Sequence, residues 1–249
     1  MEQVDKFKNA FLAVKANGEY TSNRSGNTGI GKTLEDAIGV TENNIDAPDL
    51  HGFEIKSQRS LSSSYVTLFT KAPTFPKAIN NKLRMTYGSD DERFKDIKVL
   101  HTSIFETRWN THGAGYGYKL KCDDSQKKLF LLVKKLENDE ITEDNIYWTY
   151  DILRDICSHK LEKLAFIQAK TRKELGKEFF TFISCSLFYG ITFEKFLSLI
   201  TSGDIMFDIR IGAYKNPKSK SYGKSHDHGS GFRIKKDKIK TLYTNNLTI

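Results

Sequence analysis

Apolar residues recur at helical spacing in four segments of the chain, and this pattern predicts an amphipathic helix in each. The segments are residues 4–16, 30–38, 152–164 and 193–200. Gly18, Gly39 and Gly203 follow three of them, and a glycine just after an apolar stripe is a common helix end. The predicted helices are therefore spread over the whole chain.

Alternating apolar and polar residues predict strands between these helices. The predicted strands are residues 53–56, 65–71, 128–136, 165–167, 205–211 and a last one that carries residues 226–233. Residues 108–118 are rich in glycine and aromatic residues, and we expect a packed loop there rather than a platform for nucleic-acid bases. Helices and strands in alternation predict an α/β fold.

The stretch from Asp49 to Lys56 carries the clearest candidate chemistry. Residues 50–52 form a predicted corner between two extended arms, and the second arm places Glu54 and Lys56 on one face, with its apolar residues on the other. Two carboxylates and an ammonium group on one rim can hold a divalent cation and still offer a positive charge to a phosphate or a water. Oxygen ligands of this kind suit Mg²⁺. The stretch therefore predicts a metal-dependent phosphodiesterase.

A second copy of this spacing of acid, acid and lysine occurs at Asp91, Asp96 and Lys98. It lies beside a charged run at residues 89–95, which is typical of an exposed turn or helix start. The second copy also lacks a Pro-Asp corner and a preceding glycine-rich segment. We therefore assign the chemistry to the first copy.

Residues 26–33 match the phosphate-binding loop G-x-x-x-x-G-K-[ST] in full. An NTPase would need an apolar strand before this loop and a later apolar strand that ends in Asp. Residues 19–25 are polar, and the strands near residues 133 and 167 are followed by Lys and Gln. We interpret the segment as a glycine-rich entry to the helix at 30–38, which a loop at 43–46 follows.

The net charge of the chain is +8, and its location is more informative than its size. Between residues 210 and 240 there are ten Lys or Arg and two Asp, which accounts for the whole excess. A concentrated basic segment is typical of a protein that binds a polyanion. A solvated basic tail is the alternative interpretation.

The same C-terminal segment has the pattern of a DNA-reading ribbon. Residues 205–212 alternate as a half-buried strand, and a basic turn leads to the last strand. A two-stranded ribbon fits the major groove, where arginine can bridge guanine O6 and N7 and aspartate can accept from cytosine N4. The strand residues with this chemistry are Asp208, Arg210, His226, Asp227, His228 and Arg233. The turn supplies Lys215, Lys218, Lys220 and Lys224 for contacts to phosphate.

Two alternatives stand beside this interpretation of the histidines. His226 and His228 have the spacing of a metal-binding pair, although no Cys or third His stands at ligand spacing. They could also be structural histidines that are satisfied within the fold.

The cysteines and the first residues of the chain indicate the cellular compartment in which we expect the protein. Cys122, Cys157 and Cys185 are odd in number and too far apart for a zinc knuckle, so we expect buried thiols in a reducing cytosol. The first residues include no apolar targeting segment, and no apolar run approaches membrane length. We therefore expect a cytoplasmic protein with no membrane partner.

Several motifs in one order resemble the MvaI/BcnI family of restriction endonucleases. The motifs are residues 26–36, 47–49, 54–57 and 67–71 near the N-terminus, and residues 208–214, 226–229 and 232–234 near the C-terminus. The likeness spans most of the chain, although residues 88–145 match poorly. The family is grouped with the mismatch-repair nicking enzyme MutH in the PD-(D/E)xK superfamily of nucleases.

The resemblance implies a PD-(D/E)xK core, a mixed sheet flanked by helices, in a bilobal chain. It implies a catalytic lobe at about residues 1–90 plus 150–170, and a DNA-recognition lobe at about residues 91–149 plus 171–249. The implied catalytic residues are Asp49, Glu54 and Lys56, with Glu35 as a supporting helix acid, and the implied Mg²⁺ ligands are Asp49, Glu54 and the Ile55 carbonyl oxygen. Lys71, at the end of one shared motif, joins the DNA-binding residues.

The implied activity is that of a type II restriction endonuclease, which cuts double-stranded DNA at a five-base-pair site with C-C and G-G flanks. A prokaryotic host with a matching DNA methyltransferase is implied as well. A MutH-like nickase and a DNA-binding module with a degenerate nuclease core are the alternatives. The sequence leaves open the central base pair, the sensitivity to methylation, the number of metal ions, the oligomeric state and the role of residues 88–145.

Overall fold

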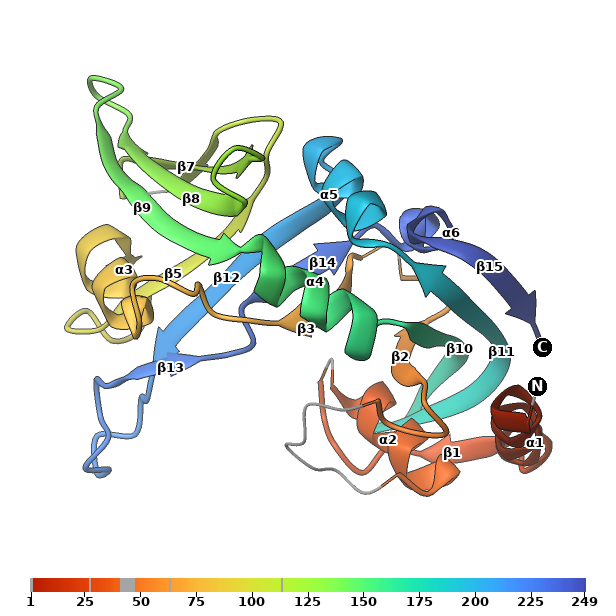
Figure 1. Cartoon of the computed structure of the whole chain (residues 1–249). Helices are drawn as coiled ribbons and strands as arrows, with labels where there is room; N and C mark the ends of the chain where they lie inside the picture. Colours follow the sequence, from red (N-terminus) through yellow and green to blue (C-terminus); the bar gives the residue numbers. More distant parts are fainter. Residues whose placement is uncertain (1, 27, 41–47, 63, 113) are drawn as a thin grey trace. The chain divides into compact units, whose positions relative to one another are not determined.

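The computed structural model describes residues 2–26, 28–40, 48–62, 64–112 and 114–249, and the chain divides into two compact units (Figure 1). Unit 1 comprises Met1–Val66, Asp155–Lys195 and Lys236–Ile249, and unit 2 comprises Thr67–Arg154 and Phe196–Lys235. Residues 67–90 and 150–154 thus lie in unit 2, and residues 171–195 and 236–249 lie in unit 1, which differs from the lobe bounds that the resemblance implied.

Unit 1 is built on a mixed sheet with the order β1-β11-β10-β2, in which β15 also pairs with β11. Its strands are β1 (Glu19–Thr21), β2 (Glu54–Arg59), β10 (Lys163–Glu174), β11 (Lys177–Ile191) and β15 (Tyr243–Thr248). β2 and β10 run parallel, with Ala165 opposite Ile55, and the other pairs are antiparallel. The expected α/β fold is confirmed.

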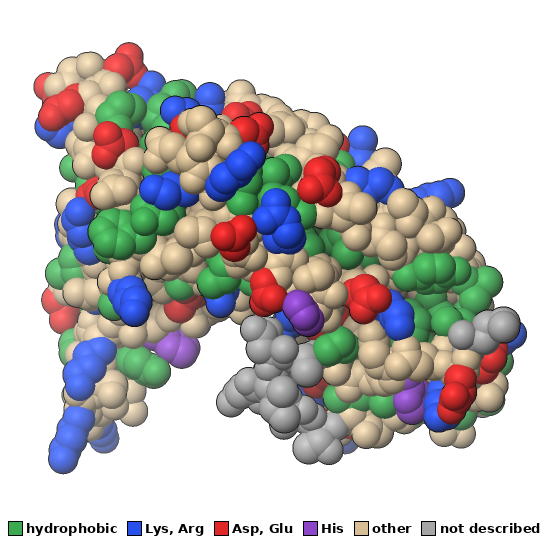
Figure 2. All heavy atoms as spheres, viewed as in Figure 1, with side chains coloured by type: hydrophobic (Ala, Val, Ile, Leu, Met, Phe, Trp, Pro, Cys, Tyr) green, Lys and Arg blue, Asp and Glu red, His purple; other side chains and the backbone are tan. Residues whose placement is uncertain are grey.

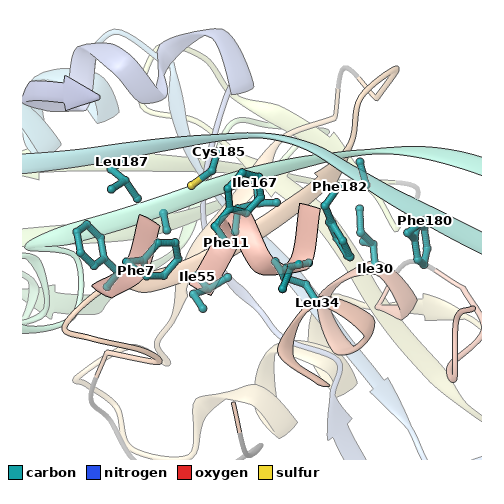
Figure 3. Packing of buried hydrophobic residues seen from close by; sticks show 14 residues of the cluster. Phe7, Phe11, Ile30, Leu34, Ile55, Ile167, Phe180, Phe182, Cys185 and Leu187 are labelled. Atoms are coloured by element: carbon teal, nitrogen blue, oxygen red, sulfur yellow. The ribbon is translucent and has the colours of Figure 1, made fainter. Parts of the chain in front are cut away.

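The first two predicted helices cover this sheet. α1 (Glu2–Ala16) buries Phe7 and Phe11, and α2 (Gly29–Ile38) buries Ile30 and Leu34. These side chains point toward the sheet and share one core cluster with residues of β2, β10 and β11 (Figure 3). Each fully buried Phe contributes about 1.5–3 kcal/mol relative to exposure. The helices thus fix one face of β2, the strand that carries the candidate chemistry.

The remaining helices are short. They are α3 (Ile79–Tyr87), α4 (Tyr150–His159), α5 (Phe193–Thr201), α6 (Ile239–Leu242) and the 3-10 helix η1 (Lys236–Lys238). α4 and α5 match the predicted helices at 152–164 and 193–200, except that α4 ends at His159 and β10 begins at Lys163. In the part of the chain that the structure describes, no helix combines the length and the apolar character needed to cross a membrane.

Unit 2 contains two sheets. The first has the order β3-β14-β12-β5-β4, with β13 also paired to β12, and the second has the order β6-β7-β8-β9. The strands of the first are β3 (Val66–Thr70), β4 (Ser89–Asp90), β5 (Lys98–Ile104), β12 (Ile205–Ala213), β13 (Ser225–Asp227) and β14 (Gly231–Ile234). Those of the second are β6 (Asn110–His112), β7 (Tyr116–Asp123), β8 (Lys128–Lys135) and β9 (Ile141–Thr149).

Three predictions about these strands are wrong. Residues 108–118 are not a loop, because β6 and the start of β7 pair there. β3, which falls within the implied catalytic lobe of about residues 1–90, does not join the sheet of unit 1 but pairs with β14 in the first sheet of unit 2. The C-terminal ribbon is not two-stranded, because β12 lies in the middle of a sheet and its partner strand is split into β13 and β14. The first error concerns a local hairpin, whereas the other two concern pairing with strands that are distant in sequence, which local alternation does not reveal.

The alternation along β12 nevertheless separates an apolar from a polar face. Phe207 packs against Trp148 and Phe232, with ring centroids 4.6 Å and 5.1 Å away. Ile205, Ile209 and Ile211 share this buried face, whereas Asp208 and Arg210 point to the opposite one. Arg210 is the one exposed residue along β12, so the strand is more buried than the predicted half-buried strand.

Gly231, at the start of β14, permits the close approach of β3. A Cβ atom at this position would lie 2.3 Å from the Phe69 carbonyl oxygen, whereas a Cβ at Gly31 in α2 would lie 3.9 Å from its nearest neighbour, Ser57 Oγ. We therefore expect Gly231→Ala to lower the free energy of unfolding by about 1–3 kcal/mol and Gly31→Ala to raise it by about 0.5–1 kcal/mol. Urea unfolding measures both, and a Gly231→Ala protein as stable as the wild type would contradict the close approach.

Candidate active site

The candidate catalytic residues of unit 1 gather where the chain turns into β2. Leu50 and Phe53 exchange backbone hydrogen bonds of 3.1 Å and 2.8 Å and close the turn. His51 and Gly52 between them have φ angles of 49° and 79°, which fit a tight corner. The predicted corner is confirmed. The arm predicted before it is described only at residues 48–49, which form no strand; Ala47 and the predicted loop at 43–46 lie outside the described residues.

Asp49 is fixed against β2 by its own carboxylate. The Ile55 N–H donates a hydrogen bond to Asp49 Oδ2 at 2.7 Å, across the turn. The charge of Asp49 also helps to raise the pKa of Glu54, so the two carboxylates lie within electrostatic range of each other. The structure thus brings together two of the acids that the spacing predicted.

Glu54 is a buried carboxylate with an incomplete set of partners. Its residue is 3% exposed, and Lys56 Nζ donates to Oε1 at 2.5 Å. The other oxygen, Oε2, is buried and has no hydrogen-bond partner among the described residues. Burial raises the pKa of Glu54 above its ordinary value, Asp49 adds to this effect, and Lys56 and Lys160 only partly oppose it. The positive charge near Glu54 is therefore too small to offset the effects of burial and of Asp49 on its pKa.

The two faces of β2 are as predicted. Phe53 and Ile55 belong to the core cluster of unit 1, and the Phe53 ring lies 5.0 Å from that of Phe7, centroid to centroid. Because side chains alternate along a strand, Glu54 and Lys56 point to the other face. The hydrophobic core thereby sets the position of the acid and the lysine.

Glu35 lies on α2, on the side that faces β2. A Cβ at Gly31 would come within 3.9 Å of Ser57 Oγ in β2, and Glu35 follows Gly31 by one helical turn on the same face. In the described part of the chain, no group of three or more His, Cys, Asp or Glu side chains is placed to hold a metal ion. Glu35 therefore does not complete a three-acid cluster with Asp49 and Glu54, and its supporting role stays a prediction.

The donors around β2 fit a hard divalent cation. The unpartnered Glu54 Oε2 and the carboxylate of Asp49 are oxygen donors of the type that Mg²⁺ takes in proteins. A cation there would also compensate the charge of a buried carboxylate whose pKa is raised. The residues present therefore fit the metal that the sequence predicts.

The second copy of the acid and lysine spacing has structural contacts instead. Asp91 Oδ1 accepts hydrogen bonds from the N–H groups of Arg93 and Phe94, and Lys215 Nζ bonds its Oδ2 at 2.5 Å. The bond from Lys215 lowers the pKa of Asp91 to about 2. Asp96 accepts a hydrogen bond from the Tyr222 hydroxyl group. These contacts explain the second copy without catalysis.

The glycine-rich segment at residues 26–33 lacks the features of a nucleotide site. The strand before it, β1, is a short strand at the edge of its sheet. The Gly29 N–H donates to the Gly26 carbonyl oxygen at 3.3 Å, and Lys32 pairs with Asp36 at 2.9 Å. Asn27 lies outside the described residues. The segment is the predicted entry to α2, where these groups bind within the chain rather than point at a phosphate.

In unit 2, one face of the first sheet collects polar side chains from four strands. Because paired residues point to the same side, β5, β12, β13 and β14 contribute together. We call this the polar face; its residues are His101, Ser103, Asp208, Arg210, His226, His228 and Arg233. The rings of His226 and His228 lie 4.5 Å apart, centroid to centroid. The face thus brings together five of the six strand residues predicted to bind DNA.

Asp227 and Lys71 have other surroundings. Asp227 pairs with Ile211 on the opposite face, and its Oδ1 accepts from the N–H groups of Gly229 and Ser230 at 2.9 Å and 2.6 Å, which closes the turn before β14. Lys71 follows β3, and its carbonyl oxygen accepts a hydrogen bond from Trp148 Nε1 at 3.0 Å.

His101 and Ser103 were missed by sequence reasoning. Both lie on β5, where buried Leu100, Thr102 and Ile104 alternate with them. This period of two was a usable signal. Burial lowers the pKa of His101, and the charge of Arg210 lowers it further, so His101 is a neutral donor and acceptor near pH 7.

The basic turn between β12 and β13 extends from this sheet. Figure 2 shows Lys and Arg side chains at the end of the projection that Figure 1 draws beyond β13. Lys218, Lys220 and Lys224 are exposed, whereas Lys215 is held by Asp91. The turn is held at its base by Arg84 of α3, which donates to the Gly223 carbonyl oxygen and to Ser225 Oγ at 2.9 Å each.

Comparisons with known proteins bear on both units. The sequence matches the description "MvaI/BcnI restriction endonuclease family" over residues 8–243. The fold is similar to the solved structure "Restriction endonuclease MvaI-cognate DNA substrate complex", with a TM-score of 0.91 and 35% identity, covering 100% of this chain and 98% of that one. It is also similar to "Restriction endonuclease MvaI in the absence of DNA", with a TM-score of 0.63 and the same identity and coverage. No curated protein matches the chain.

The raised pKa of Glu54 predicts a pH-dependent contribution to stability. The folded chain keeps the Glu54 proton to a higher pH than the unfolded chain, so this contribution is present at low pH and is lost as pH rises from 4.5 through the raised value. Glu54→Gln lacks it. We expect the free energy of unfolding of the wild type minus that of Glu54→Gln to fall as pH rises from 4.5 through the raised pKa of Glu54. Urea unfolding at several pH values without divalent metal measures the difference, and a flat difference would contradict the assignment.

Proposed function

The chain belongs to the MvaI/BcnI restriction endonuclease family and is a site-specific deoxyribonuclease, and we propose that it is a type II enzyme that uses Mg²⁺ to cut both strands of DNA at a short site. The observation that carries the proposal is the meeting of Asp49, Glu54 and Lys56 at the start of β2, where a buried carboxylate oxygen lacks a partner within the described chain. These residues also argue against a degenerate nuclease core, because all the charged groups of the motif are present.

Asp49, Glu54 and the Ile55 carbonyl oxygen would hold the Mg²⁺. When bound, the cation supplies Lewis acidity to the scissile phosphate and to the attacking water. The turn at residues 50–53 sets the distance between the acids, because the hydrogen bond from Ile55 N–H fixes Asp49 Oδ2. Glu35, on the side of α2 that faces β2, is the supporting acid of this proposal.

Lys56 supplies the remaining positive charge. Its ammonium group bonds Glu54 Oε1 and is 23% exposed, so it is held in place and still open to solvent on one side. In this position it can donate a hydrogen bond that orients the attacking water and can offset the negative charge that develops on the phosphate. The strand fixes both groups before substrate binds, which is the preorganisation that such catalysis needs.

We propose that unit 1 is the catalytic lobe and unit 2 the DNA-recognition lobe. MvaI has been solved with a cognate DNA substrate, and double-stranded DNA is accordingly the substrate proposed here. The polar face would contact base edges, while Lys71 and the turn lysines Lys215, Lys218, Lys220 and Lys224 would contact phosphates. The proposed site has five base pairs with C-C and G-G flanks. A cytoplasmic, prokaryotic setting with a protective methyltransferase belongs to this proposal.

Replacing catalytic residues tests the site in unit 1. We expect Asp49→Ala or Lys56→Ala to lower the cleavage rate in Mg²⁺ by at least about 10³-fold, while sequence-specific DNA binding remains measurable. Digestion of DNA of known sequence, with the ends sequenced, gives the rate, the site and the strands that are cut. Asp96→Ala, in the second copy of the motif, is the control and should cleave like the wild type.

Three outcomes would change the proposal. Cleavage that survives Asp49→Ala but not Asp96→Ala would mean that the first copy is not the reaction centre. Cutting of one strand only would favour a MutH-like nickase. A metal bound at Glu54 stabilises the folded state, so Mg²⁺ should raise the melting temperature of the wild type more than that of Glu54→Gln. An equal rise in both proteins, or no rise in either, would argue against a metal at Glu54.

We expect the turn lysines to bind the phosphates of DNA without selecting its sequence. Lys218→Ala or Lys220→Ala should weaken binding to all duplexes alike and lower the slope of log K against log salt by about one unit, because one phosphate contact is lost. Lys135→Ala is the control, since Lys135 is paired with Glu140 at 2.7 Å in the other sheet of unit 2. Binding is measured across a salt series, and a loss confined to one sequence would contradict a phosphate contact.

A further inference from the structure

The carboxylate of Asp208 lies at the centre of the polar face, and its oxygens are already engaged. Its side chain is 3% exposed. Oδ1 accepts a hydrogen bond from Ser103 Oγ at 3.0 Å, and Oδ2 accepts one from Arg210 Nε at 2.7 Å. An aspartate that selects cytosine must present an open oxygen to the N4 amino group. Because Asp208 is buried and both of its oxygens already accept hydrogen bonds, neither oxygen is open to a cytosine N4 amino group.

Arg210 differs from Asp208, because much of its side chain is exposed and its terminal nitrogens are left open to a partner. The side chain is 47% exposed. It binds Asp208 through Nε, and its terminal nitrogens donate to no acceptor in the described residues. The backbone is fixed on both sides, because its N–H donates to Ser230 Oγ at 2.8 Å and its carbonyl oxygen accepts from the His228 N–H at 2.9 Å. A planar guanidinium group bound by Nε keeps the fork of its two terminal nitrogens for a bidentate partner.

Arg233 shares the same carboxylate oxygen. Its Nε lies 2.9 Å from Asp208 Oδ2, as an ion pair without an aligned hydrogen bond, and its side chain is 20% exposed. Burial lowers the pKa of Arg233, and the charge of Arg210 opposes that of Asp208. One carboxylate therefore serves two guanidinium groups, and the cluster keeps a net positive charge. Such a cluster attracts an acceptor-rich partner.

We propose that Asp208 is a positioning residue rather than a base contact, and that with Ser103 it fixes the Arg210 guanidinium group so that its terminal nitrogens meet O6 and N7 of a single guanine. This inference rests on the proposed function, since it assigns the polar face to the major groove of DNA. Arg233 completes the cluster by pairing with the same oxygen of Asp208, which helps to hold that carboxylate in place. Guanine is the base that offers two adjacent acceptors to an arginine fork in that groove.

Binding measurements can separate this role from two others. In a Lys56→Ala background without divalent metal, selection from a duplex library with randomised sequence defines the preferred site without cleavage. Affinities are then compared on that site and on its single-base-pair variants for Arg210→Lys, Asp208→Asn, Ser103→Ala and Asp208→Asn/Arg210→Lys. Asp204→Asn is the matched control, because it removes an ion pair with Lys235 of 2.7 Å beside β12, outside the cluster.

Arg210→Lys keeps the charge and loses the fork, so discrimination at one G·C pair is expected to fall about 10- to 100-fold. Asp208→Asn should lower discrimination at the same base pair, and the double variant should lose no more than Arg210→Lys alone, because both act through one guanidinium group. Ser103→Ala should give a smaller loss there. Asp204→Asn should leave discrimination unchanged. Loss of folded protein alone would weaken all duplexes equally and leave the ratio unchanged.

Two results would overturn the proposal. If Asp208→Asn relaxes preference at a different base pair and adds to Arg210→Lys, Asp208 itself contacts a base. If Arg210→Lys folds like the wild type but weakens all duplexes alike, or if the library yields no preferred site, Arg210 does not select guanine. Should Asp208→Asn not fold, Ser103→Ala decides the positioning role by the base pair at which it acts. A protein that selects a site but does not cut with Mg²⁺ would refute the proposed cleavage and leave this inference standing.

Discussion

The arrangement in unit 1 depends on the burial of the Glu54 carboxylate. Removing an ionised carboxylate from water costs several kcal/mol unless partners replace its hydration. Here the ammonium group of Lys56 satisfies one oxygen and leaves the other without a partner in the described chain. The cost is offset on the other face of the same strand, where Phe53 and Ile55 enter the core. Packing, rather than the contacts of Glu54 itself, holds the acid where a cation can reach it.

Unit 2 contains a buried carboxylate with the opposite balance of charge. Glu54 has too little positive charge near it, whereas Asp208 serves both Arg210 and Arg233. The first imbalance favours a cation, and the second favours a partner rich in acceptors. Both carboxylates lie on strands whose neighbouring residues are buried, so neither can relax by turning to solvent. The proposed nuclease function uses both kinds of site, and β2 and β12 would provide one in each unit.

The parts of this design that were predictable from the sequence are local. The alternation from Phe53 to Lys56 assigns the acid and the lysine to one face, because successive side chains of a strand point to opposite sides. The corner at residues 50–52 and the end of α2 at Gly39 follow from turn chemistry within a few residues. The second motif copy could be set aside for the same kind of reason, and the contacts of Asp91 with the N–H groups of Arg93 and Phe94 are the turn that its charged run predicts.

Apart from the β6–β7 hairpin, the parts that escaped prediction depend on pairing between distant strands. Asp208 looks like a base-reading aspartate when β12 is considered with β13 and β14 alone, and Ser103, the residue that engages its other oxygen, lies on β5, more than a hundred residues earlier in the chain. Once β5 is placed beside β12, His101 and Ser103 lie on the polar face by register. The charged residues of that face then divide into Asp208, which is proposed to position its partners, and the arginines Arg210 and Arg233 that pair with it. The lysines of the basic turn do not need a fixed position in a sheet, since a flexible side chain with a point charge can adjust to a phosphate. An arginine fork that must match two atoms of one base does need a fixed position, which is why the proposed function puts the selective residues on a central strand and the phosphate-binding lysines on the turn.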